Sequence, residues 1–216
     1  MRKSLVMVSL AITVLAAAAI AGGAPVTVNF DALDTSGGAI SGAPLHNYLA
    51  GYGISVSDMT PGTDVYAADE RQTYGGGVVG ATSPYNYFCH HGGSGGTISY
   101  TLNFDTPLNS FGFSHCALNV SSIYVSWTAT AYDSVGGVLD TASFPYSTRF
   151  DASTFTLDGP DIASVRFDQT SSGGAAFRGA NVDDFVLDPV PEPSTFVLLG
   201  MGAVALAVYG RRRRRR

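Results

Sequence analysis

The segment Thr97-Ile98-Ser99-Tyr100-Thr101-Leu102-Asn103-Phe104 decides the fold class, because polar and apolar residues alternate strictly along it. A second segment repeats this alternation with apolar residues at every second position: Ile123, Val125, Trp127, Ala129 and Ala131. Successive side chains of a strand point to opposite faces, so both segments predict strands with one apolar and one polar face. Residues 25–189 show no convincing period of 3.6 residues, and crossover helices are therefore not expected.

Further short strands are predicted at residues 26–30, 53–57, 110–118, 138–144, 153–157, 163–168 and 182–187. The sequence Asp133-Ser134-Val135-Gly136-Gly137 separates two of them and is typical of a hairpin turn. Short strands with Gly-rich turns favour an all-β fold, namely an antiparallel β-sandwich and within that class a jelly roll. The Gly-rich section 60–96 interrupts the pattern and is either a long functional loop or a set of weak strands.

The composition supports this fold class and excludes several others. The 216 residues include 26 glycines and are 11% aromatic but only 13% charged, which argues against a helical bundle, a coiled coil or a charged disordered chain. Residues 25–189 hold 4 basic and 16 acidic side chains, a net charge of −12. Such a domain repels phosphate, so nucleic acid is not an expected partner.

Residues 1–24 predict a signal peptide that forms a helix. Arg2 and Lys3 are followed by the uncharged apolar run 5–20, and Ala19-Ile20-Ala21 fits an A-x-A cleavage site. An uncleaved membrane anchor is the alternative. The sequence therefore predicts that residues 25–189 form an exported domain.

Export also bears on the two cysteines of the chain, Cys89 and Cys116. An oxidising compartment favours a disulfide between them. A zinc site that includes the neighbouring His90, His91 and His115 is the alternative, since these are zinc-binding residue types. Neighbours on a strand point to opposite faces, however, which makes convergence on one ion difficult. The disulfide is the favoured prediction.

Residues 190–216 contain three parts in a fixed order. Pro191-Glu192-Pro193 precedes an apolar run, predicted as a transmembrane helix over 195–210, and the chain ends in Arg211, Arg212, Arg213, Arg214, Arg215 and Arg216. A helix over 195–210 would rise about 24 Å, which is short of a hydrocarbon core of about 30 Å. The arginines would act as a stop-transfer signal and stay in the cytoplasm. An ordinary C-terminal anchor is the alternative to a processed signal.

This arrangement resembles the PEP-CTERM sorting signal of Gram-negative bacteria, a module also labelled the ice-binding protein C-terminal domain. The resemblance implies that an exosortase-like membrane enzyme processes the chain near Pro191-Glu192-Pro193. It also implies transient residence in the inner membrane and a final place at the cell surface or in the extracellular matrix. Ice binding is not implied for residues 25–189, because Thr128-Ala129-Thr130 and Thr154-Phe155-Thr156 are too few to form a repeated flat face.

Oxygen ligands near the two ends of the domain predict a candidate calcium site. Asp31 follows the first predicted strand, and Asn181, Asp183 and Asp184 begin the last. Carboxylate and amide oxygens suit Ca²⁺, whereas solvated carboxylates that bind nothing are the alternative. The sequence Asn181-Val182-Asp183-Asp184-Phe185 is weakly similar to the closing strand of galactose-binding-like and carbohydrate-binding-module sandwiches. That similarity implies a structural calcium ion as the cofactor.

Some patterns match catalytic motifs, but the secondary structure predicted around them differs from what those motifs require. No catalytic residue is therefore assigned. Gly92-Gly93-Ser94-Gly95-Gly96 fits G-x-S-x-G but precedes a predicted strand, whereas a nucleophile elbow leads into a helix. We therefore expect a non-catalytic surface or extracellular-matrix protein, with exopolysaccharide as its candidate ligand. A secreted carbohydrate-active hydrolase is the alternative.

Overall fold

The computed structural model describes residues 23–69, 78–79, 86–92, 96–118, 125–147, 153–171, 178–190 and 202. The chain divides into two units, Pro25–Pro189 on the one hand and Met1–Ala24 with Val190–Arg216 on the other. Pro191-Glu192-Pro193 and the arginine tail lie outside the described residues, as do the predicted signal peptide apart from residues 23–24 and the predicted transmembrane helix 195–210 apart from residue 202. In the part of the chain that the structure describes, no helix has the length and hydropathy needed to cross a membrane.

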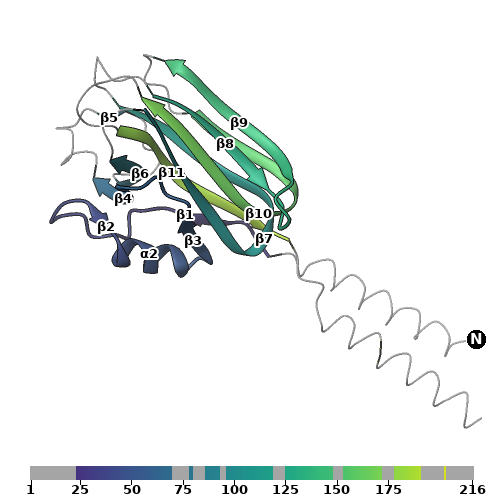
Figure 1. Ribbon diagram of the computed structural model, residues 1–216. Coiled ribbons are helices and arrows are strands. Elements are labelled where there is room, and N and C mark those ends of the chain that lie inside the picture. The colour runs from purple at the N-terminus through teal and green to yellow at the C-terminus, as the bar shows by residue number, and fades with distance from the viewer. Residues whose placement is uncertain are drawn as a thin grey trace, which may run out of the picture. The chain divides into compact units, whose positions relative to one another are not determined.

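The described part of Pro25–Pro189 is mostly antiparallel β-structure, which confirms the predicted all-β class. Its elements are β1 (Val26–Val28), β2 (Ile40–Ser41), α2 (Ala43–Ala50), β3 (Ile54–Ser57), β4 (Thr63–Asp69), β5 (Val78–Val79), β6 (Asn86–Gly92), β7 (Gly96–Leu118), β8 (Val125–Tyr132), β9 (Val138–Ser147), β10 (Ser153–Ser171) and β11 (Arg178–Pro189). The strands pair in the order β2-β4-β6-β11-β7-β10-β8-β9, with β1 beside β11, and β3 and β5 beside β7. Figure 1 shows β7, β10, β8 and β9 running side by side.

Strands β7 and β10 are long enough to belong to two layers. The first part of β7, to Phe104, pairs with β3 and with the second part of β10, whereas its later part pairs with β11 and the first part of β10. Register shifts between Asp158 and Ser164 mark the change in β10. The sequence predicted two separate strands for each of them, because the polar residues at each bend interrupt the alternation.

Aromatic contacts show that the two layers face each other. The ring of Phe88 on β6 lies 5.6 Å from that of Tyr100 on β7, and the ring of Phe155 on β10 lies 4.7 Å from that of Trp127 on β8. These rings belong to the core, in which nearly every member is an alternate residue of a strand. The arrangement is a β-sandwich, and the jelly-roll connectivity stays a prediction.

Five elements were not delimited from the sequence, namely β2, α2, β4, β5 and β6. Helix α2 is only eight residues long and buries Leu45 and Leu49, and two such positions are too few to establish a helical period. Strands β4 and β6 lie in the Gly-rich section and bury consecutive residues, such as Tyr87 and Phe88 on β6. A strand buried on both faces has no alternation, so its sequence lacks the signal that identified β7 and β8.

Candidate functional site

The outer side of the layer formed by β3, the first part of β7, the second part of β10, β8 and β9 is rich in hydroxyl groups. Along β7 and β8, the alternate residues Tyr100, Leu102, Ala129 and Ala131 point into the core, so the residues between them share the outer side. We call this surface the hydroxyl face and define it by Ser57, Ser99, Thr101, Asn103, Thr128, Thr130, Tyr132, Arg166 and Asp168.

The strand register places one charged pair at the centre of the hydroxyl face. Arg166 on β10 lies opposite Thr101 on β7 and Thr130 on β8. Asp168, two residues further along β10, lies opposite Ser99 and Thr128. A cation and an anion are thus each flanked on both sides by a hydroxyl group.

The Arg166 guanidinium is held in place by two neighbours. Its Nε donates to both carboxylate oxygens of Asp168 at 3.1 Å, and its Nη2 donates to Ser99 Oγ at 3.0 Å. The side chains of Arg166 and Asp168 remain 38% and 40% exposed. Within the described contacts Nη1 has no partner, so the guanidinium keeps unengaged N–H donors while Asp168 and Ser99 fix its orientation.

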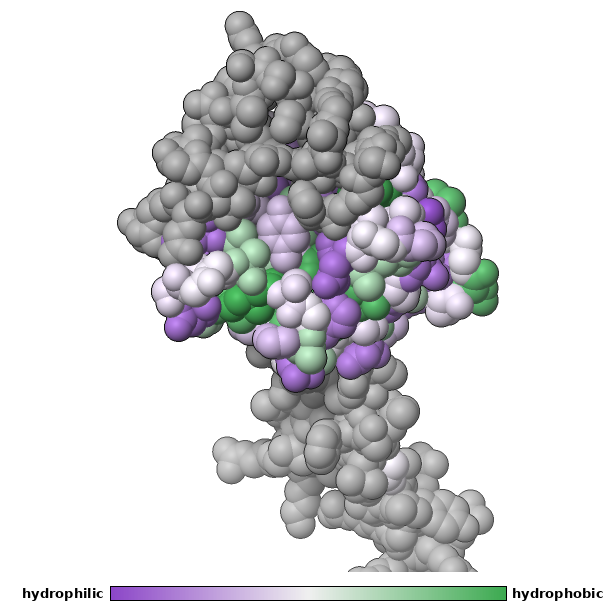
Figure 2. All heavy atoms as spheres, turned by 60° about the vertical axis from the view of Figure 1, so that its left-hand side comes forward, coloured by the Kyte–Doolittle hydropathy of each residue, from purple (hydrophilic) through white to green (hydrophobic). Residues whose placement is uncertain are grey.

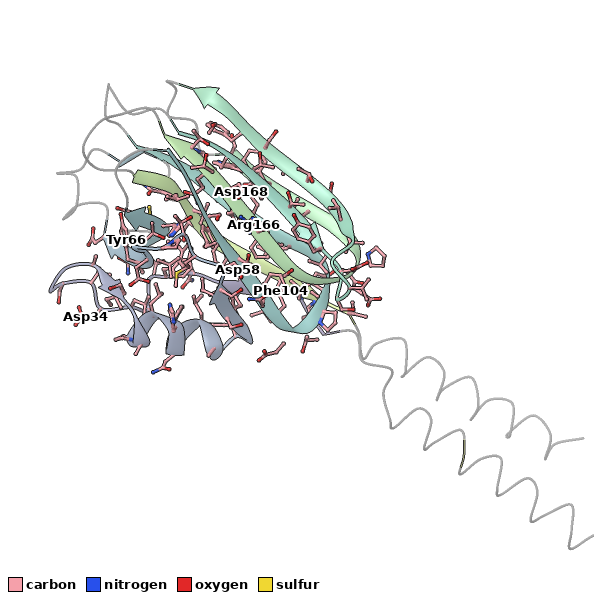
Figure 3. All side chains as sticks on the ribbon, in the orientation of Figure 1. Asp34, Asp58, Tyr66, Phe104, Arg166 and Asp168 are labelled. Carbon is pink, nitrogen blue, oxygen red and sulfur yellow. The ribbon has the colours of Figure 1, made fainter. Side chains whose placement is uncertain are left out.

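A second polar network lies beside this pair at the edge of the layer. Asn103 Nδ2 donates to Ser57 Oγ at 2.9 Å, and the Ser57 hydroxyl donates to Asp58 Oδ2 at 3.1 Å. Asp58 has a positive φ of 50°. In Figure 3, Asp58, Arg166 and Asp168 follow one another across the same part of the sheet. The hydroxyl face therefore combines a fixed cation, carboxylates, an amide and hydroxyl groups.

The four predicted calcium ligands lie on β11 and shortly after β1. Asn181 and Asp183 are buried on β11, in the other layer. Asp183 Oδ1 accepts the Asp184 N–H at 2.8 Å, and Asp31 Oδ1 accepts the Asn86 N–H at 3.3 Å. Among the residues that the structure describes, no three or more His, Cys, Asp or Glu side chains come together to hold a metal ion. The calcium site stays a prediction.

The register also separates the two cysteines. Cys89 on β6 and Cys116 on β7 both lie opposite Asn181, on either side of β11. Two inter-strand spacings put their Cα atoms roughly 10 Å apart, whereas a disulfide spans Cα distances of roughly 4.4–6.8 Å. A whole strand thus lies between the two partners of the predicted disulfide, and the pairing stays a prediction.

Two histidines of the alternative zinc site, His90 and His115, face the core. Cys89 shares the outer face with Asn181, whereas the neighbouring His90 faces the core, 5.1 Å from the ring of Tyr100. His115 also faces the core, where its Nδ1 accepts a hydrogen bond from Trp127 Nε1 at 3.0 Å. Burial lowers the pKa of His115 to about 4. This histidine is neutral at pH 7 and acts as a buried acceptor for tryptophan.

An apolar cavity of about 280 Å³ lies where β1 begins and β11 ends. Its walls come from Val26, Tyr52, Phe104, Leu108, Leu187 and Pro189, with Gly51, Gly53 and Thr106. Figure 2 shows hydrophilic and hydrophobic residues interspersed over the described surface in that view. The cavity is far less polar than the hydroxyl face.

These observations define the class of protein. It is a β-sandwich with one polar, hydrogen-bonding outer face, and residues 190–216 follow the sandwich in the sequence. Residues 189–215 match the family model of the PEP-CTERM protein-sorting motif. This match confirms the resemblance to the PEP-CTERM sorting signal that was based on Pro191-Glu192-Pro193 and the arginine tail. The motif marks the chain for exosortase-dependent sorting to the envelope of a Gram-negative bacterium.

Comparison with curated proteins finds no match. Among solved structures, a cleaved adhesin domain of Lys-gingipain from Porphyromonas gingivalis has 15% identity and a TM-score of 0.46, covering 78% of this chain and 99% of that one. The family 11 carbohydrate-binding module from Clostridium thermocellum, in complex with a mixed-linked tetrasaccharide, has 9% identity and a TM-score of 0.37, covering 78% and 97%.

An arabinose-bound α-L-arabinofuranosidase has 15% identity and a TM-score of 0.42. The match covers 69% of this chain but only 24% of the arabinofuranosidase. The chain therefore spans about a quarter of that enzyme, and the enzyme's activity does not transfer to it.

Proposed function

We propose that this chain is a non-catalytic protein of the cell surface or extracellular matrix, processed by an exosortase-like enzyme, whose β-sandwich binds exopolysaccharide. The proposed sorting rests on one observation, the match of residues 189–215 to the PEP-CTERM protein-sorting motif. Residues 1–24 would direct export, and the helix over 195–210 would hold the chain in the inner membrane until it is processed.

Charge gives this proposal its physical basis. Six consecutive arginines after Gly210 resist transfer across the membrane, so residues 25–189 would stay outside while the tail stays in the cytoplasm. The prolines on both sides of Glu192 favour an extended backbone. A membrane enzyme could therefore reach Pro191-Glu192-Pro193 while the chain is paused.

The hydroxyl face supports binding rather than hydrolysis. A glycosidase places one carboxylic acid and one carboxylate on opposite sides of the scissile bond. Asp168 is instead bound by Arg166, and the residues opposite it on the neighbouring strands are Ser99 and Thr128 rather than a second carboxylate. Turnover of any polysaccharide by the purified chain would favour the alternative, a carbohydrate-active hydrolase.

Replacement of Glu192 tests the sorting proposal. In the native host, Glu192→Ala should accumulate as an unprocessed form in the inner membrane, whereas Asp188→Ala, at the end of β11, should be processed as in the wild type. Cell fractionation followed by mass spectrometry of the C-terminus separates these forms. Mature wild-type protein that still ends in Arg216 would refute processing.

A further inference from the structure

We propose that the hydroxyl face binds a neutral polysaccharide, with the Arg166 guanidinium as its central hydrogen-bond donor. This deepens the polysaccharide binding proposed above by naming the surface and the chemical class of the ligand. The inference depends on residues 54–60, 97–104, 125–132 and 162–170, all of which the structure describes, and on none of the residues of the sorting motif.

The hydroxyl groups form a regular array that suits a chain of sugars. Neighbouring strands are about 4.8 Å apart, and alternate residues on one strand are about 6.8 Å apart. Thr128 and Thr130 on β8, with Ser99 on β7, place their hydroxyl groups on this grid beside Arg166 and Asp168, whereas Thr101 is only 7% exposed. Each hydroxyl can both donate and accept, as can each hydroxyl of a sugar.

Polarity alone does not carry the inference, because many antiparallel sheets expose one polar face to water. The distinguishing feature is the fixed guanidinium. Asp168 and Ser99 orient the plane of Arg166 before any ligand arrives, so binding would cost little side-chain entropy. An arginine held only by solvent would lack this preorganisation.

Charge selects a neutral ligand over an acidic one. Asp168 balances the positive charge of Arg166 at 3.1 Å, and Asp58 adds a further carboxylate at the edge of the face. The domain as a whole carries a net charge of −12. A polysaccharide with carboxylate groups would therefore be repelled, and sugar hydroxyls remain as the groups that this surface can recognise.

Tyr132 adds an aromatic surface at one end of the array. It follows Thr128 and Thr130 at the next outward position of β8 and lies opposite Ser164, two residues before Arg166. A half-buried tyrosine offers both a ring face for the C–H side of a sugar and a hydroxyl group.

Affinity electrophoresis of the full-length chain in detergent tests the inference. Gels would contain a neutral galactan, glucan or mannan, or the acidic polymers alginate or polygalacturonate. We expect at least one neutral polymer, and neither acidic one, to retard the wild type. Arg166→Ala should weaken this retardation at least tenfold, and Arg166→Lys should not restore it, since lysine lacks the planar donor set.

Matched threonine pairs provide the control. Thr128→Val/Thr130→Val removes two hydroxyl groups from the hydroxyl face and should weaken binding several-fold. Thr154→Val/Thr156→Val removes two exposed hydroxyl groups from the outer side of the other layer and should bind as the wild type does. Both replacements keep a β-branched residue in a strand, and unchanged melting curves would verify folding of each variant.

A charge variant tests selectivity. Asp168→Asn should leave Arg166 uncompensated, so that alginate or polygalacturonate begins to retard the chain. The inference is overturned if no neutral polymer retards the wild type, if acidic polymers are preferred, or if Arg166→Ala and the Thr128/Thr130 double variant bind normally. Because Glu192→Ala tests sorting separately, either proposal can fail without the other.

Discussion

Acidification should destabilise the sandwich through His115, by an amount that can be worked out from its environment. This side chain is buried, its ring centroid lies 4.3 Å from that of Phe144, and its Nδ1 accepts the Trp127 Nε1–H. Protonation would remove that acceptor and leave an imidazolium ion in an aromatic core. Burial accordingly lowers the pKa of His115 from 6.5 to about 4.

The direction of the change in stability with pH follows from proton binding. Between pH 6.5 and 4 the unfolded chain binds a proton at His115 and the folded chain does not, so the free energy of unfolding falls as pH falls. The neutral histidine contributes its full stability above pH 6.5. The loss relative to neutral pH is about 2 kcal/mol at pH 5 and reaches about 3 kcal/mol below pH 4.

Urea unfolding at several pH values measures this loss. Trp127 is the one tryptophan of the chain and the hydrogen-bond partner of His115, so its fluorescence reports directly on this region. His115→Asn keeps an acceptor but does not titrate, and the comparison with the wild type removes the contribution of the carboxylates. Equal pH dependence of the two proteins between pH 7 and 4.5 would refute the reasoning.

Three further predictions follow from packing and pairing. Asn86→Ala should lower the free energy of unfolding by about 2–4 kcal/mol. The Asn86 side chain donates hydrogen bonds to the carbonyls of Phe30 and Leu33 and accepts one from the Thr35 hydroxyl. Thermal unfolding measures the loss, with Asn29→Ala, at an exposed position, as the control. Gly159→Ala should lower the melting temperature, since its Cβ would lie 2.9 Å from Leu139 Cβ and 3.1 Å from Leu139 Cδ1. A melting curve unchanged by Gly159→Ala would show that β9 can move away. Intact mass after alkylation under denaturing conditions, without reductant, should reveal two modified thiols because β11 separates Cys89 from Cys116; a mass that shifts only after reduction would contradict this register.

Alternation along single strands was sufficient to predict the fold class. The segment 97–104 shows why, because its apolar residues Ile98, Tyr100 and Leu102 are buried as the sequence pattern predicts, although Thr101 between them is buried too. Thr128 and Thr130 could be assigned to one face of a strand for the same reason. Local periodicity reports which side of a strand is buried, and in these segments the packing agrees with it.

Long-range register could not be predicted in the same way. Nothing in the sequence around Arg166 indicates that Ser99 lies within hydrogen-bond distance, because this contact joins residues 67 positions apart. The separation of Cys89 from Cys116 depends on β11 entering between β6 and β7. Nor does the sequence indicate that the Asn86 N–H donates to Asp31, a contact between residues 55 positions apart.

The pairing of Val26 with Leu187 has a consequence for maturation. The first and last strands of the sandwich are neighbours, so the domain begins and ends at one pole. Cleavage ahead of Pro25 and cleavage beyond Pro189 would both leave their stubs at that pole, and neither would remove a residue that pairs in the sheet. The two cuts could therefore occur in either order without opening the core, and the released protein would keep the stability of its precursor.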